Sequence, residues 1–350
     1  MIDNQASDVY LSDVSEKDKP WDKYGHAKSK ASQLYRLVAN ENEGSRFWKW
    51  ADRMDKCSSL LEFVLKSNNS GECKFKLHHS EFCRCPRCCT CQWRKSLKWR
   101  GRFINAIPQI MAGCPNQRFI FLTLTVKNCD IEDLKSIIGQ MNRGWKLLTK
   151  SKEFPAVGFV KSLEVTRNHK TDQAHPHFHS LLMVPEDYFR GTRYISQKRW
   201  TELWQRSLKT EYSPRVDVRA IRDRNGNNQG RAALENAVLE TIKYAVKAKD
   251  IFGDLDLDKY GDVLDTSKNW HRAVWFMELT DQMYKLRTIS LGGAFREYLK
   301  EEELEDEDDL VHVGEDDDAD EVTEDDLHLF FGWKSLVKRY TKVEPRYEFT

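Results

Sequence analysis

Apolar and polar positions follow two different periods along the chain. From Trp21 to about Leu65, apolar residues recur near the helical spacing, which predicts amphipathic helices. Beyond Pro115, strand-like runs alternate with helix-like runs. Strands are predicted at residues 118–126, 157–166, 176–184 and 214–221, and helices at residues 130–150, 194–209 and 232–247. This order is close to a split βαβ unit with one added helix, which predicts an α+β fold with a central antiparallel sheet flanked by helices.

The length of the chain and its termini also bound its organisation. At 350 residues it exceeds what one compact core usually holds, so two domains are expected. Residues 1–20 are polar and lack a period, and we expect them to be flexible. No run approaches about eighteen apolar residues, and the N-terminus lacks the pattern of a signal peptide. These features predict a cytoplasmic protein with no membrane partner.

The formal net charge of +1 hides an uneven distribution of charge. Residues 301–326 contain 17 Asp or Glu and no Lys or Arg, so the other 324 residues hold 38 acids and 56 bases, an excess of about 18 positive charges. An excess of that size favours a nucleic acid partner over a role in solubility alone. The acidic segment 301–326 is predicted to be disordered, either as a solvated linker or as a weak competitor with DNA for the basic body.

The cysteines crowd into one region. Seven of the nine lie between Cys57 and Cys91, which in a cytosolic chain indicates zinc rather than disulfides, because thiolates bind zinc tetrahedrally and a small module gains folding energy from it. A basic and aromatic stretch follows at once, beginning at Trp93. Its cations are candidate DNA contacts: Arg94, Lys95, Lys98, Arg100 and Arg102.

Three histidines mark the predicted strand at 176–184. On a strand, side chains alternate between the two faces, so His177 and His179 project from the same face, preceded by His175. Two imidazoles on one rigid face can hold a divalent cation. Glu164 interrupts the apolar residues of the preceding strand and is the candidate carboxylate ligand, with a surface position or a salt bridge as the alternative.

A third group of polar residues lies on the predicted helix at 232–247. Glu240, Tyr244 and Lys247 share one helical face. A tyrosine hydroxyl with a carboxylate one turn away and lysines around it suits attack on a phosphodiester, since the phenolate is a nucleophile and the cations screen charge. The alternative is an ordinary solvated helix face.

Together these motifs resemble the HUH endonucleases, specifically the rolling-circle replication initiators of small bacterial plasmids, over most of the chain. Residues 121–125 look like the family's first motif, residues 163–166 and 175–179 like its metal motif, and residues 240–247 like its tyrosine motif. Residues 286–295 are similar to a distal family segment. The resemblance implies an HUH endonuclease domain of the single-tyrosine type.

The resemblance further implies a metal-dependent nuclease that nicks one strand of origin DNA. His177, His179 and Glu164 would hold Mn2+ or Mg2+, and imidazole ligands bias the site toward Mn2+. Tyr244 would attack, leaving a 5′-phosphotyrosyl link and a free 3′-hydroxyl that primes synthesis. Glu240 would serve as the general base of a terminating hydrolysis. The implied partners are single- and double-stranded origin DNA, a host helicase and a replicative polymerase.

The resemblance also sorts the cysteines, because family members carry a Cys-x4-Cys-x2-Cys pattern followed by Trp-Arg, with one cysteine upstream. The matching zinc ligands in this chain are Cys57, Cys83, Cys88 and Cys91. Three further cysteines depart from the pattern: Cys73, Cys85 and Cys89. They leave the exact ligand set open, with Cys73 or Cys85 as the alternative to Cys57. Cys114 and Cys129 are expected to be ordinary half-buried thiols.

The resulting organisation has five parts. Residues 1–20 are a flexible N-terminus, 21–112 a helical and zinc-binding DNA-contact module, 113–300 the HUH endonuclease domain, 301–326 the acidic disordered segment, and 327–350 a C-terminal tail with a short helix. Two alternative functions stay open. A transposase or relaxase would share the histidines and the tyrosine, and a zinc-dependent DNA-binding regulator would carry a degenerate nuclease domain.

Overall fold

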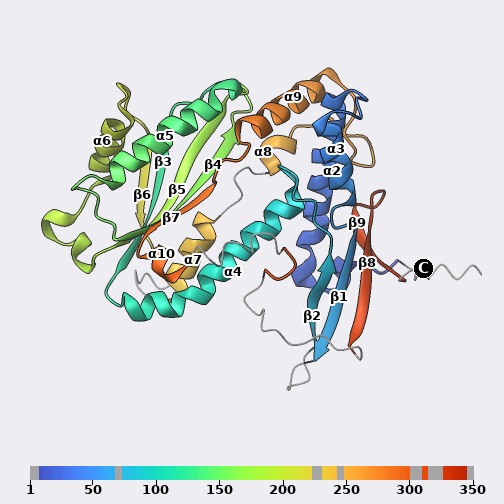
Figure 1. Ribbon diagram of the computed structural model, residues 1–350, viewed down its shortest axis with the longest axis horizontal. Helices are drawn as coiled ribbons and strands as arrows, with labels where there is room; N and C mark the ends of the chain where they lie inside the picture. The colour runs from blue at the N-terminus through green and yellow to red at the C-terminus, as the bar shows by residue number, and fades with distance from the viewer. Residues whose placement is uncertain are drawn as a thin grey trace, which may run out of the picture. The chain divides into compact units, whose positions relative to one another are not determined.

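The computed structural model describes residues 8–67, 73–222, 231–242, 248–299, 310–313 and 326–344 (Figure 1). By internal contacts the chain forms two compact units. The first comprises Met1–Lys95, Phe252–Met277 and Asp309–Thr350, and the second comprises Ser96–Ile251 and Glu278–Asp308. Neither unit is continuous in sequence, whereas the predicted boundaries at 112 and 300 divide the chain into consecutive parts.

The second unit is built on a five-stranded antiparallel sheet with the strand order β6-β3-β5-β4-β7. Its strands are β3 (Arg118–Thr125), β4 (Gly158–Arg167), β5 (Ala174–Val184), β6 (Val216–Ala220) and β7 (Ile289–Gly293). Its helices include α5 (Leu134–Thr149), α6 (Gln197–Leu208), α7 (Arg231–Thr241) and α10 (Phe295–Tyr298). The predicted α+β class with an antiparallel sheet is confirmed. The distal segment at 286–295 supplies β7, an edge strand that the hydrophobic pattern did not predict.

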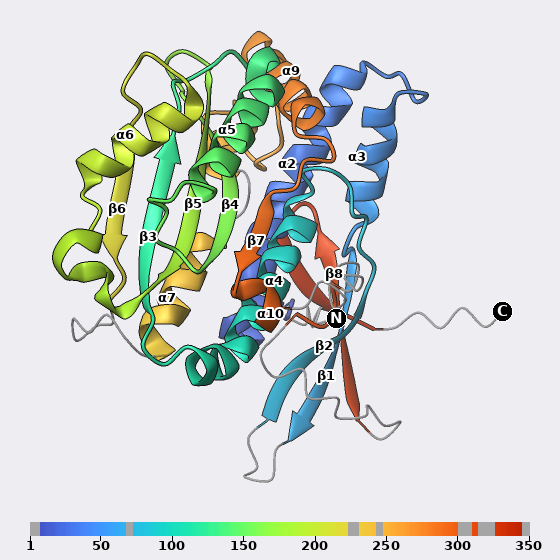
Figure 2. The same cartoon turned by 60° about the vertical axis from the view of Figure 1, so that its left-hand side comes forward.

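Helices cover both faces of this sheet, because apolar side chains project from both faces of its strands. On one face, Trp145 of α5 meets Phe159 and Phe178 edge-on, at centroid distances of 5.0 and 6.2 Å. On the other face, Phe121 and Leu181 belong to a buried cluster with residues of α7, of α10 and of α4 (Cys89–Gly113). Figure 2 shows α5 and α6 in front of the sheet and α7 behind it. The strands therefore form a rigid middle layer.

The first unit contains helices and a second sheet. Its helices include α2 (Pro20–Ala39) and α3 (Arg46–Lys56), and its antiparallel sheet has the order β2-β1-β8-β9. The strands are β1 (Leu60–Ser67), β2 (Cys73–Ser80), β8 (Leu327–Lys334) and β9 (Arg339–Val343). Two further helices, α8 (Ala248–Phe252) and α9 (Ser267–Gln282), carry the chain from one unit to the other.

The short helix predicted within residues 327–350 is wrong, because this segment forms β8 and β9. β8 pairs along β1, and this pairing buries Phe331 against Phe63 with ring centroids 6.0 Å apart. The helical expectation for residues 60–65 is wrong for the same reason, since these residues form β1. The partners are more than 260 residues apart in sequence, so local spacing carried no sign of them.

The expectation of a flexible segment over residues 1–20 is also wrong for the described part. Leu11–Val14 forms α1, and Glu16–Asp18 forms a short 3-10 helix. Leu11 is fully buried, and Tyr10 forms an isolated bridge with Thr341. Within the acidic segment, residues 301–309 and 314–325 lie outside the described part of the chain. Between them, Leu310 and Val313 are buried.

None of the helices in the described ranges combines the length and the apolar character needed to cross a lipid bilayer.

Candidate functional site

A carboxylate and two imidazoles converge on one face of the five-stranded sheet. In the ladder between β4 and β5, Glu164 lies directly opposite His177. Glu164 Oε2 is 2.8 Å from His179 Nε2 and 3.3 Å from His177 Nε2. One ligand atom from each of the three residues lies within 4.8 Å of the other two. Glu164 is buried at 1% exposure, and such a site is costly for a carboxylate unless a cation partners it.

The Nδ1 atom of each imidazole lies within hydrogen-bonding distance of a neighbouring group. His177 Nδ1 is 3.2 Å from the carbonyl of His175, and His179 Nδ1 is 3.2 Å from Thr123 Oγ1. Phe121 stacks on the ring of His179 at a centroid distance of 5.4 Å. Thr123 and Phe121 belong to the segment 121–125, which resembles the family's first motif, although the sequence did not indicate which groups this segment contacts. In metal sites such contacts fix ring orientation and tautomer.

This arrangement fits a cation between the three groups. A carbonyl only accepts hydrogen bonds, so Nδ1 of His177 must donate to His175, and a neutral ring then carries its lone pair on Nε2. That lone pair faces the carboxylate oxygen of Glu164, and two acceptors face each other favourably only when a proton or a metal ion lies between them. Mixed imidazole and carboxylate donors suit divalent transition metals.

The tyrosine motif, residues 240–247, is described only in part. Glu240 is in the last turn of α7, and its side chain is not described. Tyr244 and Lys247 lie in residues 243–247, outside the described part of the chain. The two residues just before this segment, Thr241 and Ile242, are fully buried. The carbonyl of Thr241 accepts a 2.6 Å hydrogen bond from Ser162 of β4.

Four thiols form a second cluster, in the first unit. The residues are Cys57, Cys83, Cys88 and Cys91, and their sulfurs all lie within 4.8 Å of one another. Sγ of Cys57 is 3.6 Å from that of Cys91 and 3.7 Å from that of Cys88. A tetrahedral zinc with Zn–S bonds of about 2.3 Å separates its sulfurs by about 3.8 Å, whereas a disulfide holds them at about 2.05 Å. The spacing is therefore that of a metal-binding tetrahedron.

Backbone turns and backbone amides shape this cluster. Arg84 and Arg87, next to Cys83 and Cys88, adopt left-handed φ angles of 53° and 63°, which turn the chain back on itself. The amide of Cys83 points to Cys57 Sγ at 3.4 Å. Hydrogen bonds within the cluster, first that of Cys57, lower the pKa of Cys83 and raise the pKa of Cys91, so thiolate character gathers on Cys83.

Two other cysteines of the region whose side chains are described, Cys85 and Cys89, lie outside this group. Cys85 is buried and Cys89 half-buried, and burial raises the pKa of Cys89 to about 12. The side chain of Cys73 is not described. Sequence reasoning also missed Tyr340 of β9, which is fully buried and donates a 2.7 Å hydrogen bond to the carbonyl of Ser58, the residue after Cys57. A strand near the C-terminus thus fixes the turn at Cys57.

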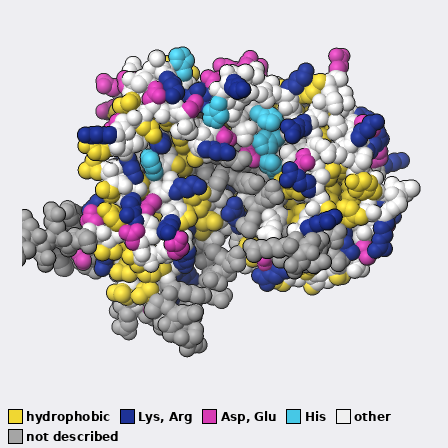
Figure 3. All heavy atoms as spheres, turned by 180° about the vertical axis from the view of Figure 1, so that it is seen from behind, with side chains coloured by type: hydrophobic (Ala, Val, Ile, Leu, Met, Phe, Trp, Pro, Cys, Tyr) yellow, Lys and Arg dark blue, Asp and Glu magenta, His cyan; other side chains and the backbone are white. Residues whose placement is uncertain are grey.

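The predicted DNA-contact residues of α4 differ in their surroundings. Arg94 is buried and donates to the carbonyls of Leu310 and Val311 at 2.8 and 2.6 Å. Lys98 is buried as well, whereas Lys95, Arg100 and Arg102 are half-buried. Arg100 donates to the carbonyl of Ile242 at 3.3 Å. Lysine and arginine side chains are spread over the face seen from behind, with histidine and acidic side chains between them (Figure 3).

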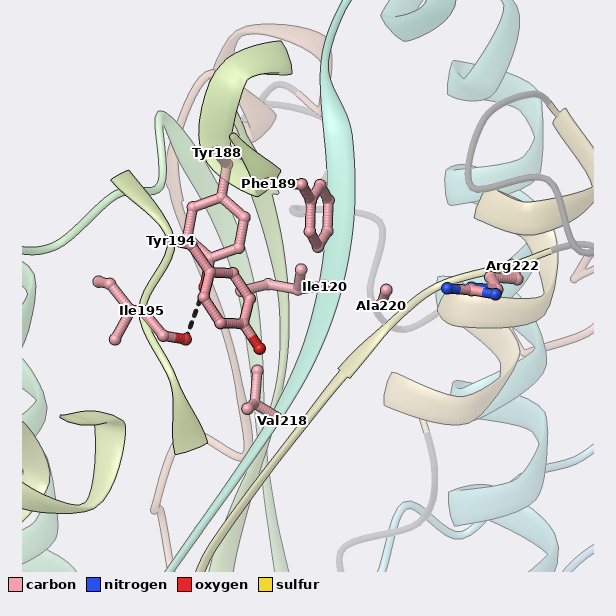
Figure 4. A pocket seen from close by; sticks show the side chains of 8 residues that line it. All are labelled: Ile120, Tyr188, Phe189, Tyr194, Ile195, Val218, Ala220 and Arg222. Atoms are coloured by element: carbon pink, nitrogen blue, oxygen red, sulfur yellow. Dashed lines mark hydrogen bonds between the residues drawn. The ribbon is translucent and has the colours of Figure 1, made fainter. Parts of the chain in front are cut away.

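A hollow of about 200 Å³ lies on the opposite face of the sheet from Glu164, where β3 meets β6. It is lined by Ile120, Tyr188, Phe189, Tyr194, Ile195, Val218, Ala220 and Arg222 (Figure 4). The hydroxyl of Tyr188 is already engaged, since it donates to the carbonyl of Ile195 at 3.4 Å and accepts from Trp200 at 3.2 Å. This hollow is separate from the group of Glu164, His177 and His179.

Known proteins similar to this chain agree on one family. A family model described as "Replication protein" matches residues 74–341. A "Protein rep" of Bacillus amyloliquefaciens is 35% identical over 308 residues, which cover 84% of this chain and 85% of the relative. A "Protein rep" of Lentilactobacillus hilgardii is 32% identical over 337 residues, which cover 94% of this chain and 98% of the relative. No solved structure matches the chain significantly.

The family match contains both the four-thiol cluster, apart from Cys57, and all three residues of the carboxylate–imidazole group. The chain therefore belongs to the replication protein family, which confirms its resemblance to the rolling-circle replication initiators of plasmids.

Proposed function

We propose that the chain is a metal-dependent nickase that cleaves one strand of origin DNA and so initiates rolling-circle replication of a plasmid. The observation that carries the proposal is the convergence of Glu164, His177 and His179 on one buried face, within 4.8 Å. A divalent cation bound there supplies Lewis-acid polarisation of the scissile phosphate. Mn2+ or Mg2+ fits this donor set, with the imidazoles favouring Mn2+.

The chain's own residues then carry out the transfer. The oxygen of Tyr244 forms a bond to phosphorus, and the bond from phosphorus to the 3′ oxygen breaks. The products are a 5′-phosphotyrosyl link and, after the departing oxygen takes up a proton, a free 3′-hydroxyl. Lys247, three residues after Tyr244 in the motif, is assigned the role of screening the charge of the phosphate.

Termination requires a second cleavage, and the motif offers a single tyrosine on its helical face. Glu240 lies in the last turn of α7 and precedes Tyr244 by four residues, so it is the carboxylate of the motif nearest in sequence to the proposed nucleophile. We assign it the activation of water for a hydrolysis that leaves no covalent link. Glu240→Ala should form the adduct and fail to release completed product, and normal termination by this variant would contradict the assignment.

The four-thiol cluster is proposed to hold a structural zinc. Its spacing supports this, and four thiolates around zinc leave no open position for a substrate. A closed site of this kind organises the first unit around Cys57, Cys83, Cys88 and Cys91 and stabilises the start of α4.

Origin DNA, single- and double-stranded, is the proposed partner, in the bacterial cytoplasm and together with a host helicase and polymerase. The basic excess outside the acidic segment supports DNA binding. Among the α4 cations, Lys95, Lys98 and Arg102 remain candidate phosphate contacts. Arg94 is the weakest candidate, because its guanidinium donates to two backbone carbonyls.

The test is a nicking assay on oligonucleotides that carry each strand of the candidate origin of the protein's own replicon. The wild type should cut one strand at one position with Mn2+ and not with EDTA, and His177→Ala with His179→Ala should abolish cutting while DNA binding persists. Binding without cleavage by the wild type would favour a zinc-dependent regulator. Cleavage restricted to hairpin ends or transfer-origin sequences would favour a transposase or relaxase.

A further inference from the structure

Two side chains from outside α7 hold the C-terminal end of this helix. Ser162 Oγ donates to the carbonyl of Thr241 at 2.6 Å, and Arg100 Nε donates to the carbonyl of Ile242 at 3.3 Å. The last carbonyls of a helix have no partner within the helix, so their partners must come from elsewhere. Both acceptors belong to fully buried residues, so water cannot supply the hydrogen bonds that these carbonyls need. The two bonds therefore fix the point where the chain leaves α7.

Ser162 also belongs to the strand that carries the candidate metal ligand. It precedes Glu164 by two residues on β4, so the two side chains leave the same face of the sheet. Across the ladder, Ser162 lies directly opposite His179. Only 3% of Ser162 is exposed. One short piece of β4 thus joins the end of α7 to the carboxylate–imidazole group.

Packing alone does not account for a serine at this position. Val160, the preceding residue on the same face, and Leu181, its partner on β5, are both buried aliphatic residues. Serine has a small side chain and gains little from a buried strand position, where β-branched residues pack better. Burial of a hydroxyl without a hydrogen-bond partner is costly, and the carbonyl of Thr241 accepts a hydrogen bond from Ser162.

We propose that Ser162 and Arg100 are positioning residues that set where the chain leaves α7, and with it the placement of Tyr244 at the scissile phosphate. Tyr244 follows Thr241 by three residues. The inference rests on the proposed function, because it requires Tyr244 to be the nucleophile. A displacement of about 1 Å at a reacting group costs on the order of 100-fold in rate. Loss of either bond therefore lowers the rate of attack and leaves DNA binding intact.

The experiment measures formation of the covalent adduct by the full-length protein. A single-stranded oligonucleotide with the candidate origin, labelled at its 3′ end, is mixed with excess protein and Mn2+. For Ser162→Ala we expect the adduct rate at saturating protein to fall roughly 10- to 100-fold. The Kd for the oligonucleotide and the Mn2+ concentration for half-maximal rate should stay unchanged. Ser162→Thr keeps the hydroxyl and should restore most of the rate.

Ser180 offers a matched control on the neighbouring strand. It is a fully buried serine of β5 whose Oγ has no hydrogen-bond partner among the described residues. Its side chain leaves the opposite face from His177 and His179, away from the end of α7. Ser180→Ala should therefore react at the wild-type rate. An equal slowing of Ser180→Ala would mean that loss of any buried hydroxyl slows the enzyme, and would overturn the positioning role.

Arg100→Ala provides an independent test of the positioning role. This test still applies if Ser162→Ala does not fold. A slower reaction at saturating protein with unchanged Kd supports the positioning role. A weaker Kd with an unchanged saturating rate makes Arg100 a DNA contact and overturns it. A Ser162→Ala protein that reacts like the wild type, or a slowing that Ser162→Thr does not relieve, overturns it for Ser162. A wild-type protein that binds the oligonucleotide without any adduct contradicts the proposed function instead, so the two failures are distinguishable.

Discussion

Glu164 of β4 lies directly opposite His177 of β5, and this pairing brings a buried carboxylate to within 3.3 Å of an imidazole nitrogen. Because the strands are antiparallel and side chains alternate, the same register brings His179 to the same oxygen at 2.8 Å. The sheet, rather than a loop, sets the geometry of the site, and a site on strands keeps its groups in place before any ligand arrives.

Thr123 should control the affinity of this group for metal. Thr123→Val removes the hydroxyl that lies 3.2 Å from His179 Nδ1, and loss of such an orienting contact typically costs about 10- to 100-fold in metal affinity. Mn2+ titration followed by electron paramagnetic resonance measures the Kd. Thr125→Val is the control, because Thr125 Oγ1 bonds the carbonyl of Arg215. Equal effects of the two substitutions would contradict the role of Thr123.

The four-thiol cluster predicts that zinc and folding are linked. Cys88→Ser should lower zinc from about one ion per chain to near zero and the Tm by on the order of 10 °C. Metal analysis by mass spectrometry and thermal unfolding measure the two effects. Cys85→Ser should retain both zinc and stability, because Cys85 lies outside the group of four sulfurs. A Cys88→Ser protein with full zinc content would contradict the ligand set.

The buried ammonium of Lys161 is expected to make the free energy of unfolding depend on pH. Burial lowers its pKa to about 8, although its ammonium contacts Asn142 at 2.7 Å and the ring of Phe178 at 3.9 Å. Below pH 8 both the folded and the unfolded chains carry this charge, and the folded state bears its desolvation cost. Between about pH 8 and 10.4 the unfolded chain binds more protons, so the contribution of Lys161 to stability becomes more favourable as pH rises, by roughly 3 kcal/mol in total.

Lys161→Met lacks this titration. Urea unfolding of the two proteins from pH 7 to 10.5 gives the difference between their free energies of unfolding, in which other titrating groups cancel. The advantage of the methionine variant should shrink as pH rises. A difference that stays constant over this range would contradict the assignment.

The acidic segment should weaken binding to non-specific DNA. Neutralising the five acidic residues within 315–320 by Asn or Gln leaves Leu310 and Val313 in place, both of which are buried. We expect a several-fold gain in DNA affinity at low salt that fades as the Debye length falls from about 10 Å at 0.1 M to about 3 Å at 1 M. Fluorescence anisotropy across a salt titration measures it, with Glu41→Gln and Glu43→Gln as controls on exposed acids. An unchanged affinity would make the segment a passive linker.

The sequence predicted the features that follow from the spacing of residues within one helix or strand. Alternation placed His177 and His179 on one face, and the interrupting Glu164 indicated the third member of that group. The contacts that the sequence could not show join distant segments. Tyr340 fixes the turn at Ser58 across 282 residues, and β8 pairs with β1 from the far end of the chain. Arg94 was expected at DNA, yet its partners are carbonyls within the acidic segment.

Small polar residues form a second class that sequence reasoning missed. Ser162 carries no pattern of its own, and although Thr123 lies in the segment that resembles the family's first motif, the sequence does not indicate what its hydroxyl contacts. The role of each residue depends on the group that its hydroxyl contacts. Ser162 contacts the end of α7, and Thr123 contacts the ring of His179. Only the register of β3, β4 and β5 brings these groups together.

The proposed nicking mechanism is tested most directly by identifying the residue that becomes covalently joined to DNA. The wild type is incubated with the candidate origin strand and Mn2+, digested with protease and nuclease, and analysed by tandem mass spectrometry. We expect a nucleotide attached through its 5′ phosphate to Tyr244, no such adduct with EDTA, and none in Tyr244→Phe, whose ring has no oxygen to attack with. An adduct on another residue, or an adduct that persists in Tyr244→Phe, would contradict it.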